Sequence, residues 1–278
     1  MHVVRLTGLA AMIALATGAV AQAKTTMPDG DWRTIDRDLA QTRFSPLAQI
    51  DKTNVANLKP LWTYPMKGNN TASPLVIGGV MYLPAGSRVV ALDADTGKEI
   101  WAHTEARVAD APRDTVSGRG VAYWPGDGKN APRIVVMRGT HMFALDAKTG
   151  ELIKSFGAEG YVDVGVSYAG TVTISGNVGV IGAATLEDPY GVPGNNRAFD
   201  MVTGAKLWEF QTVAQPNQPG HETWLDSGWW GRSGTNQWGF SAPVDEDLGL
   251  MFIPVGNPSH NYWGGRRPSS CAMGCRPG

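Results

Sequence analysis

One short stretch occurs three times in this sequence at a nearly constant spacing, and it constrains the possible folds more than any other feature. Each copy follows the pattern Ala-x-Asp-x-x-Thr-Gly and ends at Gly97, Gly150 or Gly204. These glycines lie 53 and then 54 residues apart. A fixed period of this length indicates a repeat architecture, in which each unit packs against its neighbours.

Each copy predicts a β-hairpin with a glycine at its tip. The Ala-x-Asp part reads as the end of a strand, the Asp and Thr side chains can bond the backbone of a turn, and glycine supplies the positive φ of the reversal. Trp101 and Trp208 stand four residues after the first and third glycines, whereas Lys154 stands there in the second copy. We expect each tryptophan to pack against a neighbouring unit, and the second copy to depart from this pattern.

The residues around the tips supply about four strands in each period. In the first period, residues 73–83 read as two strands about a Gly-Gly turn, and residues 88–92 lead into the tip. The later periods repeat this plan around turns at residues 125–128 and 175–177, and a fourth unit begins at Gln237. Four-stranded antiparallel units of this length are typical of propeller blades. The predicted fold class is therefore all-β, a partial β-propeller with about four blades.

The N-terminal residues have the features of a secretory signal peptide. Residues 1–23 combine a short basic start, an apolar run too short to span a membrane comfortably and an Ala-x-Ala site, which predicts cleavage after Ala23. We therefore expect the mature chain to be exported. No later segment of the sequence approaches membrane-spanning length, so a transmembrane segment is not expected after cleavage.

The rest of the sequence divides into three parts. Residues 24–60 read as an irregular arm, in which Asp51 would cap a short helix over residues 51–58. Residues 61–265 form the predicted propeller, with strand signals from the first residues onward. From residue 266 to residue 278 the strand periodicity is lost, and we interpret this stretch as an aberrant tail left by a frameshift or truncation.

Charge and cysteine content exclude several classes of function. A net charge of −1 gives no electrostatic support for binding nucleic acid or an anionic membrane. The two cysteines, Cys271 and Cys275, both lie in the tail, so disulfides are not expected to hold the fold. The histidines show no metal-ligand spacing.

The repeat and its surroundings resemble the quinoprotein dehydrogenases, which are eight-bladed propellers that use pyrroloquinoline quinone (PQQ) and Ca²⁺. The tips are similar to the tryptophan-docking motif of that family, and residues 43–62 resemble its leading segment. Residues 119–127 look like its second-blade signature, whereas residues 234–239 and 255–258 look like its cofactor-floor and metal segments. The resemblance covers roughly residues 32–265 and implies about four of eight blades.

The resemblance implies a cofactor site with four matched residues. Trp238 matches the aromatic residue that stacks on PQQ, and Thr235 matches a neighbouring hydroxyl donor. Arg119 matches the arginine that pairs with a PQQ carboxylate, and Asn257 matches an amide that offers its oxygen to Ca²⁺. Each residue alone also fits an ordinary structural role, as core aromatic, turn residue or surface ion pair. Their occurrence as an ordered set favours the cofactor site.

Five further residues are weaker matches to the same site. Thr71, Thr171 and Thr173 lie where the family has groups that bond PQQ carboxylates, although threonine is also common in strands for its β-propensity. Glu187 and Asp188 both lie where the family has its metal carboxylate, and their spacing does not choose between them.

The sequence also departs from the family pattern. Many members carry two adjacent cysteines over the cofactor, where this chain has residues 111–114, Ala-Pro-Arg-Asp. The family's catalytic Asp sits in a His-Asp-x-Trp-Asp stretch downstream of the segment that Asn257 matches, and this stretch does not occur here. We therefore expect a chain that is truncated before the catalytic base and inactive alone.

Two functions follow from the resemblance as hypotheses. The first is a periplasmic PQQ-dependent dehydrogenase that oxidises an alcohol or sugar hydroxyl by hydride transfer to PQQ and passes electrons to a quinone or cytochrome. The alternative is a non-catalytic propeller, either a scaffold of the outer-membrane assembly type or a PQQ-binding fragment. A scaffold has no need of Arg119, Thr235, Trp238 and Asn257 in this order, which favours the dehydrogenase.

Overall fold

The computed structural model describes residues 27–66, 71–104, 116–185, 188, 190–237 and 242–259. These residues are almost entirely β-structure and turns, and no helix among them is long and apolar enough to cross a membrane. The strands form three four-stranded antiparallel sheets and one two-stranded hairpin. The predicted all-β fold with four-stranded blades is therefore confirmed.

Each four-stranded sheet is one blade, and its strands pair in the order of the sequence. Blade 1 contains β1 (Leu75–Ile77), β2 (Val80–Ala85), β3 (Arg88–Asp93) and β4 (Glu99–Thr104). Blade 2 contains β5 (Ala122–Trp124), β6 (Arg133–Arg138), β7 (His141–Asp146) and β8 (Tyr161–Asp163). Blade 3 contains β9 (Thr173–Ser175), β10 (Val178–Ile181), β11 (Asn196–Asp200) and β12 (Lys206–Phe210). The start of a fourth unit is the hairpin of β13 (Val244–Asp245) and β14 (Leu250–Met251).

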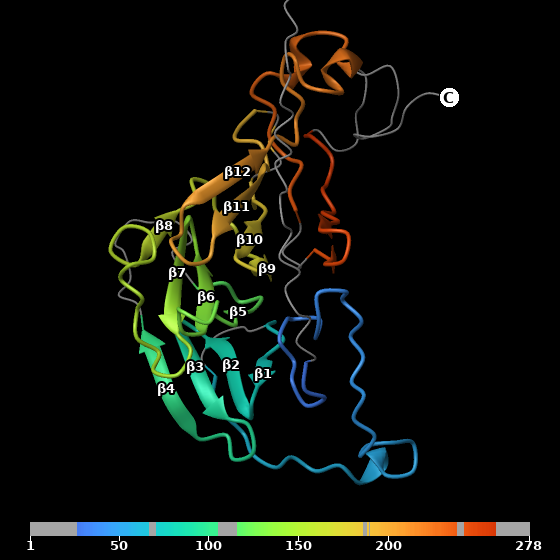
Figure 1. The fold of residues 1–278 in the computed structure, drawn as a ribbon. Coiled ribbons are helices and arrows are strands. Elements are labelled where there is room, and N and C mark those ends of the chain that lie inside the picture. Colours follow the sequence, from blue (N-terminus) through green and yellow to red (C-terminus); the bar gives the residue numbers. More distant parts are fainter. Residues whose placement is uncertain are drawn as a thin grey trace, which may run out of the picture.

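The three blades stack face to face, as Figure 1 shows, with the first strand of each blade toward the blue N-terminal arm. Apolar side chains fill the two seams between them. The seam between blades 1 and 2 contains Tyr82, Trp101, Ile134 and Phe143, among others. The seam between blades 2 and 3 contains Trp124, Phe156, Tyr168 and Phe199, among others. Burial of these side chains at about 25 cal/mol per Å² is the main force that holds the blades together.

The repeated tips are turns of the expected kind. In the first tip, Oδ1 of Asp93 accepts hydrogen bonds from the backbone N–H of Thr96 at 2.8 Å and from its hydroxyl at 2.6 Å. Gly97 has a φ of +67°, in the left-handed region that favours glycine. The same carboxylate-to-backbone bonds recur at Asp146 and Asp200 in the other tips. Local side-chain chemistry therefore fixes all three reversals.

A tryptophan from the preceding segment docks on each of the first two tips. Nε1 of Trp62 donates to the carbonyl of Ala94 at 3.0 Å, and Nε1 of Trp101 donates to the carbonyl of Ala147 at 3.1 Å. A Cβ added to Gly97 would lie 2.5 Å from the Trp62 ring, so the indole fills the space that glycine leaves open. The predicted packing against a neighbouring unit is confirmed for Trp101.

The third tip is held by a different side chain. Lys154 occupies the position from which a tryptophan would dock on it, so the sequence indicated this departure. Nη1 of Arg133 donates to the carbonyls of Met201 at 2.9 Å and Val202 at 2.8 Å. The guanidinium of Arg133 also lies over the Trp124 ring, 5.0 Å from its centroid. A cation from β6 therefore supplies the hydrogen bond that an indole supplies at the other two tips.

Three local predictions differ from the structure. Residues 51–58 contain only a 3₁₀ turn, Val55–Asn57, and Asp51 does not cap it, because its carboxylate accepts from the backbone and hydroxyl of Thr53. Residues 61–64 are extended but not a strand, because they pair with no described neighbour. After the second tip only Leu152 bridges back to β7, and the outer strand β8 starts later. Two further 3₁₀ turns, His221–Thr223 and Ser227–Trp229, lie in the long loop after β12.

Candidate cofactor site

The structure brings three of the predicted residues together, and we call Thr71, Arg119 and Thr171 the arginine cluster. The backbone N–H and the hydroxyl of Thr71 both donate to the carbonyl of Gly118, at 3.1 and 3.2 Å. A Cβ added to Gly120 would lie 3.0 Å from the Thr171 methyl group, so the two residues are in contact. Arg119 stands between these two contacts in the chain and is half-buried.

A hydroxyl that the sequence did not indicate ties the arginine cluster to blade 3. Oγ of Ser117 donates to the carbonyl of Ala169 at 2.6 Å and accepts from the backbone N–H of Arg119 at 3.3 Å. Ser117 is 5 % exposed, so water competes little for these bonds. The main chain that carries Arg119 is therefore held against the segment that precedes β9.

Two buried hydroxyls beside Arg119 lack partners among the described residues. They are Oγ1 of Thr171 and the hydroxyl of Tyr168, which lies near the Gly182 main chain without hydrogen-bond geometry. Burial raises the pKa of Tyr168, and the positive charge of Arg119 acts in the opposite direction. An unsatisfied buried hydroxyl costs about 1–3 kcal/mol, so such groups need an explanation. Two free donors beside a cation suit a ligand that carries carboxylates.

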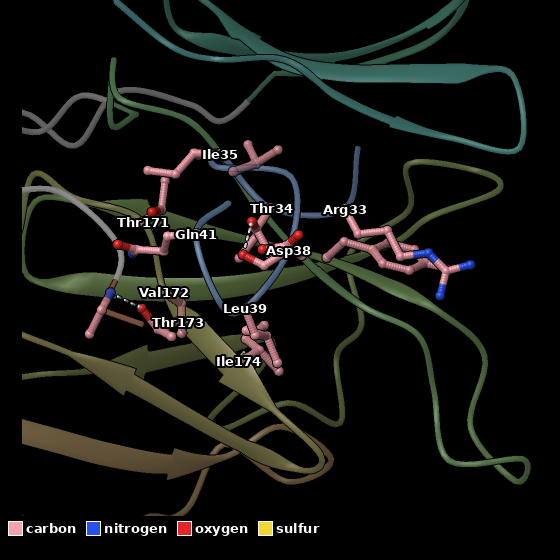
Figure 2. Close-up of a pocket in the computed structure, with 14 residues that line it drawn as sticks. Arg33, Thr34, Ile35, Asp38, Leu39, Gln41, Thr171, Val172, Thr173 and Ile174 are labelled. Atoms are coloured by element: carbon pink, nitrogen blue, oxygen red, sulfur yellow. Dashed lines mark hydrogen bonds between the residues drawn. The ribbon is translucent and has the colours of Figure 1, made fainter. Parts of the chain in front are cut away.

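Thr173 differs from Thr171 in that its hydroxyl has a hydrogen-bond partner. Its Oγ1 accepts from the backbone N–H of Ala242 at 3.0 Å, so it already has a main-chain partner. Thr171 and Thr173 both line a narrow cavity of about 20 Å³ that the N-terminal arm closes, with Asp38 and Gln41 nearby (Figure 2). A cavity of this size holds about one water molecule, and is too small for a tricyclic cofactor.

A second group of predicted residues meets where three loops converge, and we call Asp188, Thr235 and Asn257 the loop cluster. The backbone N–H of Thr235 donates to the main-chain carbonyl of Asn257 at 2.9 Å. The main-chain carbonyl of Asp188 accepts from the hydroxyls of Ser233 and Ser259. The loops that carry Asp188, Thr235 and Asn257 therefore lie side by side.

Thr235 is held in an unusual conformation within the loop cluster. Its φ is +56°, which is uncommon for a residue other than glycine, and its side chain is fully buried. Its hydroxyl donates to the carbonyl of Gly234 and bonds the hydroxyl of Thr212. The local hydrogen bonds therefore fix the loop at the residue that precedes the predicted cofactor floor.

The predicted metal ligands are partly in view. The side chains of Asp188 and Asn257 are exposed, so their oxygens are accessible to a ligand. Glu187 and Trp238 lie outside the described residues, so their predicted roles stay predictions. Across the described part of the chain, no group of three His, Cys, Asp or Glu side chains lies close enough to hold a metal. Amide and main-chain oxygens, which Ca²⁺ also accepts, remain available here.

The end of β10 connects the two clusters. Gly182, next to the Tyr168 hydroxyl, leaves no room for a Cβ because the Gln237 side chain packs on it. Oδ1 of Asn236 accepts from the backbone and hydroxyl of Thr185, and its Nδ2 donates back to the Thr185 carbonyl at 2.9 Å. Both clusters therefore border the same region of blade 3.

A scan against family models matches residues 32–273 to the family described as PQQ: glucose/ethanol/alcohol dehydrogenase, beta-propeller domain. The dehydrogenase subunit of alcohol dehydrogenase (quinone) from Komagataeibacter europaeus is 34% identical over 258 residues, covering 83% of this chain and 34% of that protein. Quinohemoprotein alcohol dehydrogenase ADH IIB from Pseudomonas putida is 35% identical over 279 residues, covering 91% of this chain and 38% of that protein. Quinoprotein glucose dehydrogenase from Escherichia coli K12 is 28% identical over 282 residues, covering 89% and 35%. The chain thus spans about a third of these relatives' length.

Solved structures give the same result. Quinohemoprotein alcohol dehydrogenase from Comamonas testosteroni matches with a TM-score of 0.66 at 30% identity, covering 82% of this chain and 36% of that one. A europium-containing methanol dehydrogenase matches with a TM-score of 0.67 at 25% identity, covering 83% and 43%. The repeated tips, the docked tryptophans and the matched residues 32–273 agree, and the chain therefore belongs to the PQQ glucose/ethanol/alcohol dehydrogenase β-propeller family.

Proposed function

We propose that this chain forms the PQQ-binding part of a dehydrogenase that oxidises an alcohol or sugar hydroxyl. One observation carries the proposal: the buried hydroxyls of Thr171, which contacts Gly120, and Tyr168, which feels the charge of Arg119, lack partners among the described residues. PQQ carries three carboxylates, and a guanidinium with neighbouring hydroxyls is the donor set that binds carboxylates most strongly. Family membership and the relatives' names support the same conclusion.

In this proposal each residue has a defined task. Arg119 pairs with a carboxylate of PQQ, and Thr171 and Tyr168 donate to it. Thr71, whose hydroxyl donates to the Gly118 carbonyl, holds the main chain next to Arg119. Trp238 lies against the plane of the cofactor, and Thr235 orients the loop that carries it. Asn257 and either Glu187 or Asp188 offer oxygens to Ca²⁺, a hard cation that prefers oxygen ligands. One similar solved structure is a europium-containing methanol dehydrogenase. When bound, PQQ supplies the quinone that accepts hydride.

The remaining features of the function are also proposals. The family's His-Asp-x-Trp-Asp stretch does not occur in this sequence, so no residue is assigned as catalytic base, and we propose that the chain alone has only background turnover. We propose that residues 1–23 direct export to the periplasm, where a quinone or cytochrome accepts the electrons. The division into an arm to residue 60, a propeller to residue 265 and a tail belongs to the same proposal.

A titration of PQQ in the presence of Ca²⁺, followed by tryptophan fluorescence, tests the binding proposal without requiring turnover. We expect saturable quenching in the parent chain, and about tenfold weaker binding in Arg119→Gln, because a charge-assisted bond is lost. Thr171→Val keeps the shape and removes one donor, so it should weaken binding less. The exposed Lys148→Gln serves as a matched loss of positive charge. Unsaturable quenching, or equal affinity of Arg119→Gln and Lys148→Gln, would contradict the proposal and favour a scaffold.

A further inference from the structure

A second pocket lies next to the loop cluster, and its lining contains no residue of the arginine cluster. It has a volume of about 240 Å³ and is lined by Asn195, Gln211, Gln215, Trp229 and Arg232, together with two loop residues. Pockets that hold drug-sized molecules are usually larger, at 300–1,000 Å³ or so. The pocket therefore suits a small ligand, about the size of one sugar unit.

Arg232 brings an unneutralised charge to this pocket. The residue is 8 % exposed, and within the described residues no carboxylate forms an ion pair with it. Nε donates to the carbonyl of Gly228 at 2.9 Å, and Nη1 donates to the carbonyl of Ser259. Neither of these bonds uses Nη2, and the guanidinium carbon lies 5.9 Å from the centroid of the Trp224 ring. A buried guanidinium is stabilised best by an anion, and a carboxylate matches its planar geometry.

The amide side chains of the pocket leave one donor and one acceptor. Nε2 of Gln215 donates to the carbonyl of Val213 at 2.9 Å, which leaves its Oε1. Oε1 of Gln211 accepts from Gln218 at 3.0 Å, which leaves its Nε2. A hydroxyl both donates and accepts, so this pair of amide groups suits hydroxyl groups. The half-buried Trp229, packed edge-on against His221 at 5.3 Å between centroids, adds an apolar wall.

We infer that this pocket binds a small hydroxy acid of the sugar-acid type, with its carboxylate on Arg232 and its hydroxyls on Gln211 and Gln215. The pocket is linked to the loop cluster, because Arg232 bonds Ser259, whose hydroxyl bonds Ser233 and the Asp188 carbonyl. The role of this ligand as substrate rests on the proposed function. The binding itself does not, because no pocket residue belongs to the arginine cluster.

Isothermal titration calorimetry on the full chain without PQQ tests the inference. The ligands are gluconate, neutral glucose of the same carbon number, and inorganic phosphate, all at one ionic strength. We expect gluconate to bind about tenfold or more tightly than glucose, since a buried charge-assisted pair is worth at least that factor. Equal affinity for gluconate and glucose would overturn the assignment of Arg232. Phosphate binding as tight as gluconate binding would overturn the hydroxy-acid assignment in favour of a general anion site.

Two variants separate the charge from the amides. Arg232→Gln should lose about tenfold in gluconate affinity and leave glucose unchanged. If this variant fails to fold, because Gly228 and Ser259 lose their donor, the double variant Gln211→Ala/Gln215→Ala carries the test. It keeps both main-chain bonds of Arg232 and should weaken gluconate and glucose by similar factors. Unchanged gluconate affinity in the double variant would reject the proposal that gluconate binds in this pocket.

The outcome is independent of the PQQ titration. Gluconate binding that persists while PQQ shows no saturable quenching would reject the proposed function and keep the pocket. PQQ binding with no gluconate binding would reject the pocket and keep the proposed function. The exposed Lys148→Gln, remote from the pocket lining in the sequence, controls for a general loss of positive charge.

Discussion

Nη1 of Arg133 lies 2.9 Å from the carbonyl oxygen of Met201, at the position where the other two tips receive an indole N–H. Met201 stands three residues before Gly204, as Ala94 stands before Gly97 and Ala147 before Gly150. Equivalent carbonyls of neighbouring tips thus accept from an indole in two cases and from a guanidinium in the third. The geometry of the tip is conserved along the stack, while the chemistry that docks on it is not.

Arg133→Met should therefore destabilise the fold by about 2–3 kcal/mol, because two buried carbonyls lose their donor while the side-chain volume is nearly kept. Chemical denaturation followed by fluorescence measures the change. Arg88→Met is the control, since Arg88 pairs with Glu99 at a largely exposed site and should cost at most about 1 kcal/mol. Equal losses in the two variants would show that Arg133 does not hold the third tip.

Gly150→Ala tests the contact between glycine and the docked indole. Gly150 has a φ of +74°, and an added Cβ would lie 2.6 Å from the Trp101 ring. Gly128 has a φ of +84° with nothing within 4 Å of an added Cβ, so Gly128→Ala carries only the backbone strain of about 1 kcal/mol. We expect Gly150→Ala to lower the melting temperature clearly more than Gly128→Ala. Similar shifts would mean that the seam relaxes around the methyl group.

The carbonyl of Ala147 accepts from two side chains, which predicts non-additive effects. Nε1 of Trp101 and the hydroxyl of Tyr82 both donate to it at 3.1 Å. Trp101→Phe also removes ring volume, whereas Tyr82→Phe removes only the hydroxyl. The double variant should lose about 1 kcal/mol more than the sum of the single variants, because only then is the buried carbonyl left without either donor. A double-mutant cycle measured by chemical denaturation that gives an interaction free energy of zero would contradict this.

The pH dependence of stability follows from the same tyrosine. Burial raises the pKa of Tyr82 to about 12, against an ordinary value of 10.0. Between these values the unfolded chain loses the proton and the folded chain keeps it, so this contribution is fully present below pH 10 and is lost as the pH rises toward 12. Denaturation at several pH values should show a steeper decline in the parent than in Tyr82→Phe, by on the order of 2 kcal/mol over this range. Parallel declines would reject the assignment.

Asn257→Ala tests the metal assignment in a residue whose side chain is not needed for the local fold. The main-chain carbonyl of Asn257, not its amide, accepts from Thr235, so the loop should stay in place. We expect weaker Ca²⁺-dependent PQQ quenching, by about tenfold, since one oxygen ligand is removed. Asp188→Asn should act similarly if Asp188 is the metal carboxylate, and the exposed Asp29→Asn should have no effect. A Ca²⁺ titration that is unchanged in Asn257→Ala would remove this residue from the site.

The sequence predicts the blades well because the information for each hairpin is local. Asp93, Thr96 and Gly97 lie within five residues of one another, and their side chains alone specify the turn. The replacement at the third tip was not predictable in the same way, because Arg133 and Met201 are 68 residues apart and no motif connects them. Lys154 indicated only that the second copy lacks the tryptophan found in the other two copies.

Motifs in the sequence predict some of the candidate-site residues, whereas others become visible only in the packed structure. Arg119, Thr235 and Asn257 stand in stretches that resemble a known family, and the structure places each of them at one of the two clusters. Tyr168 and Arg232 have no such signal, since their importance comes from burial and from missing partners, which only the packed structure defines. The failed cap at Asp51 shows the same limit, because a carboxylate that can cap a helix can equally close a turn with Thr53.

At every tip the docking side chain precedes the tip in the chain. Trp62 comes before Gly97, Trp101 before Gly150, and Arg133 before Met201. During synthesis each seam can thus close as soon as the next hairpin emerges, without waiting for later residues. Each contact can therefore form in the order of synthesis, and Trp208, the equivalent of Trp101 in the third copy, is 44 % exposed on β12.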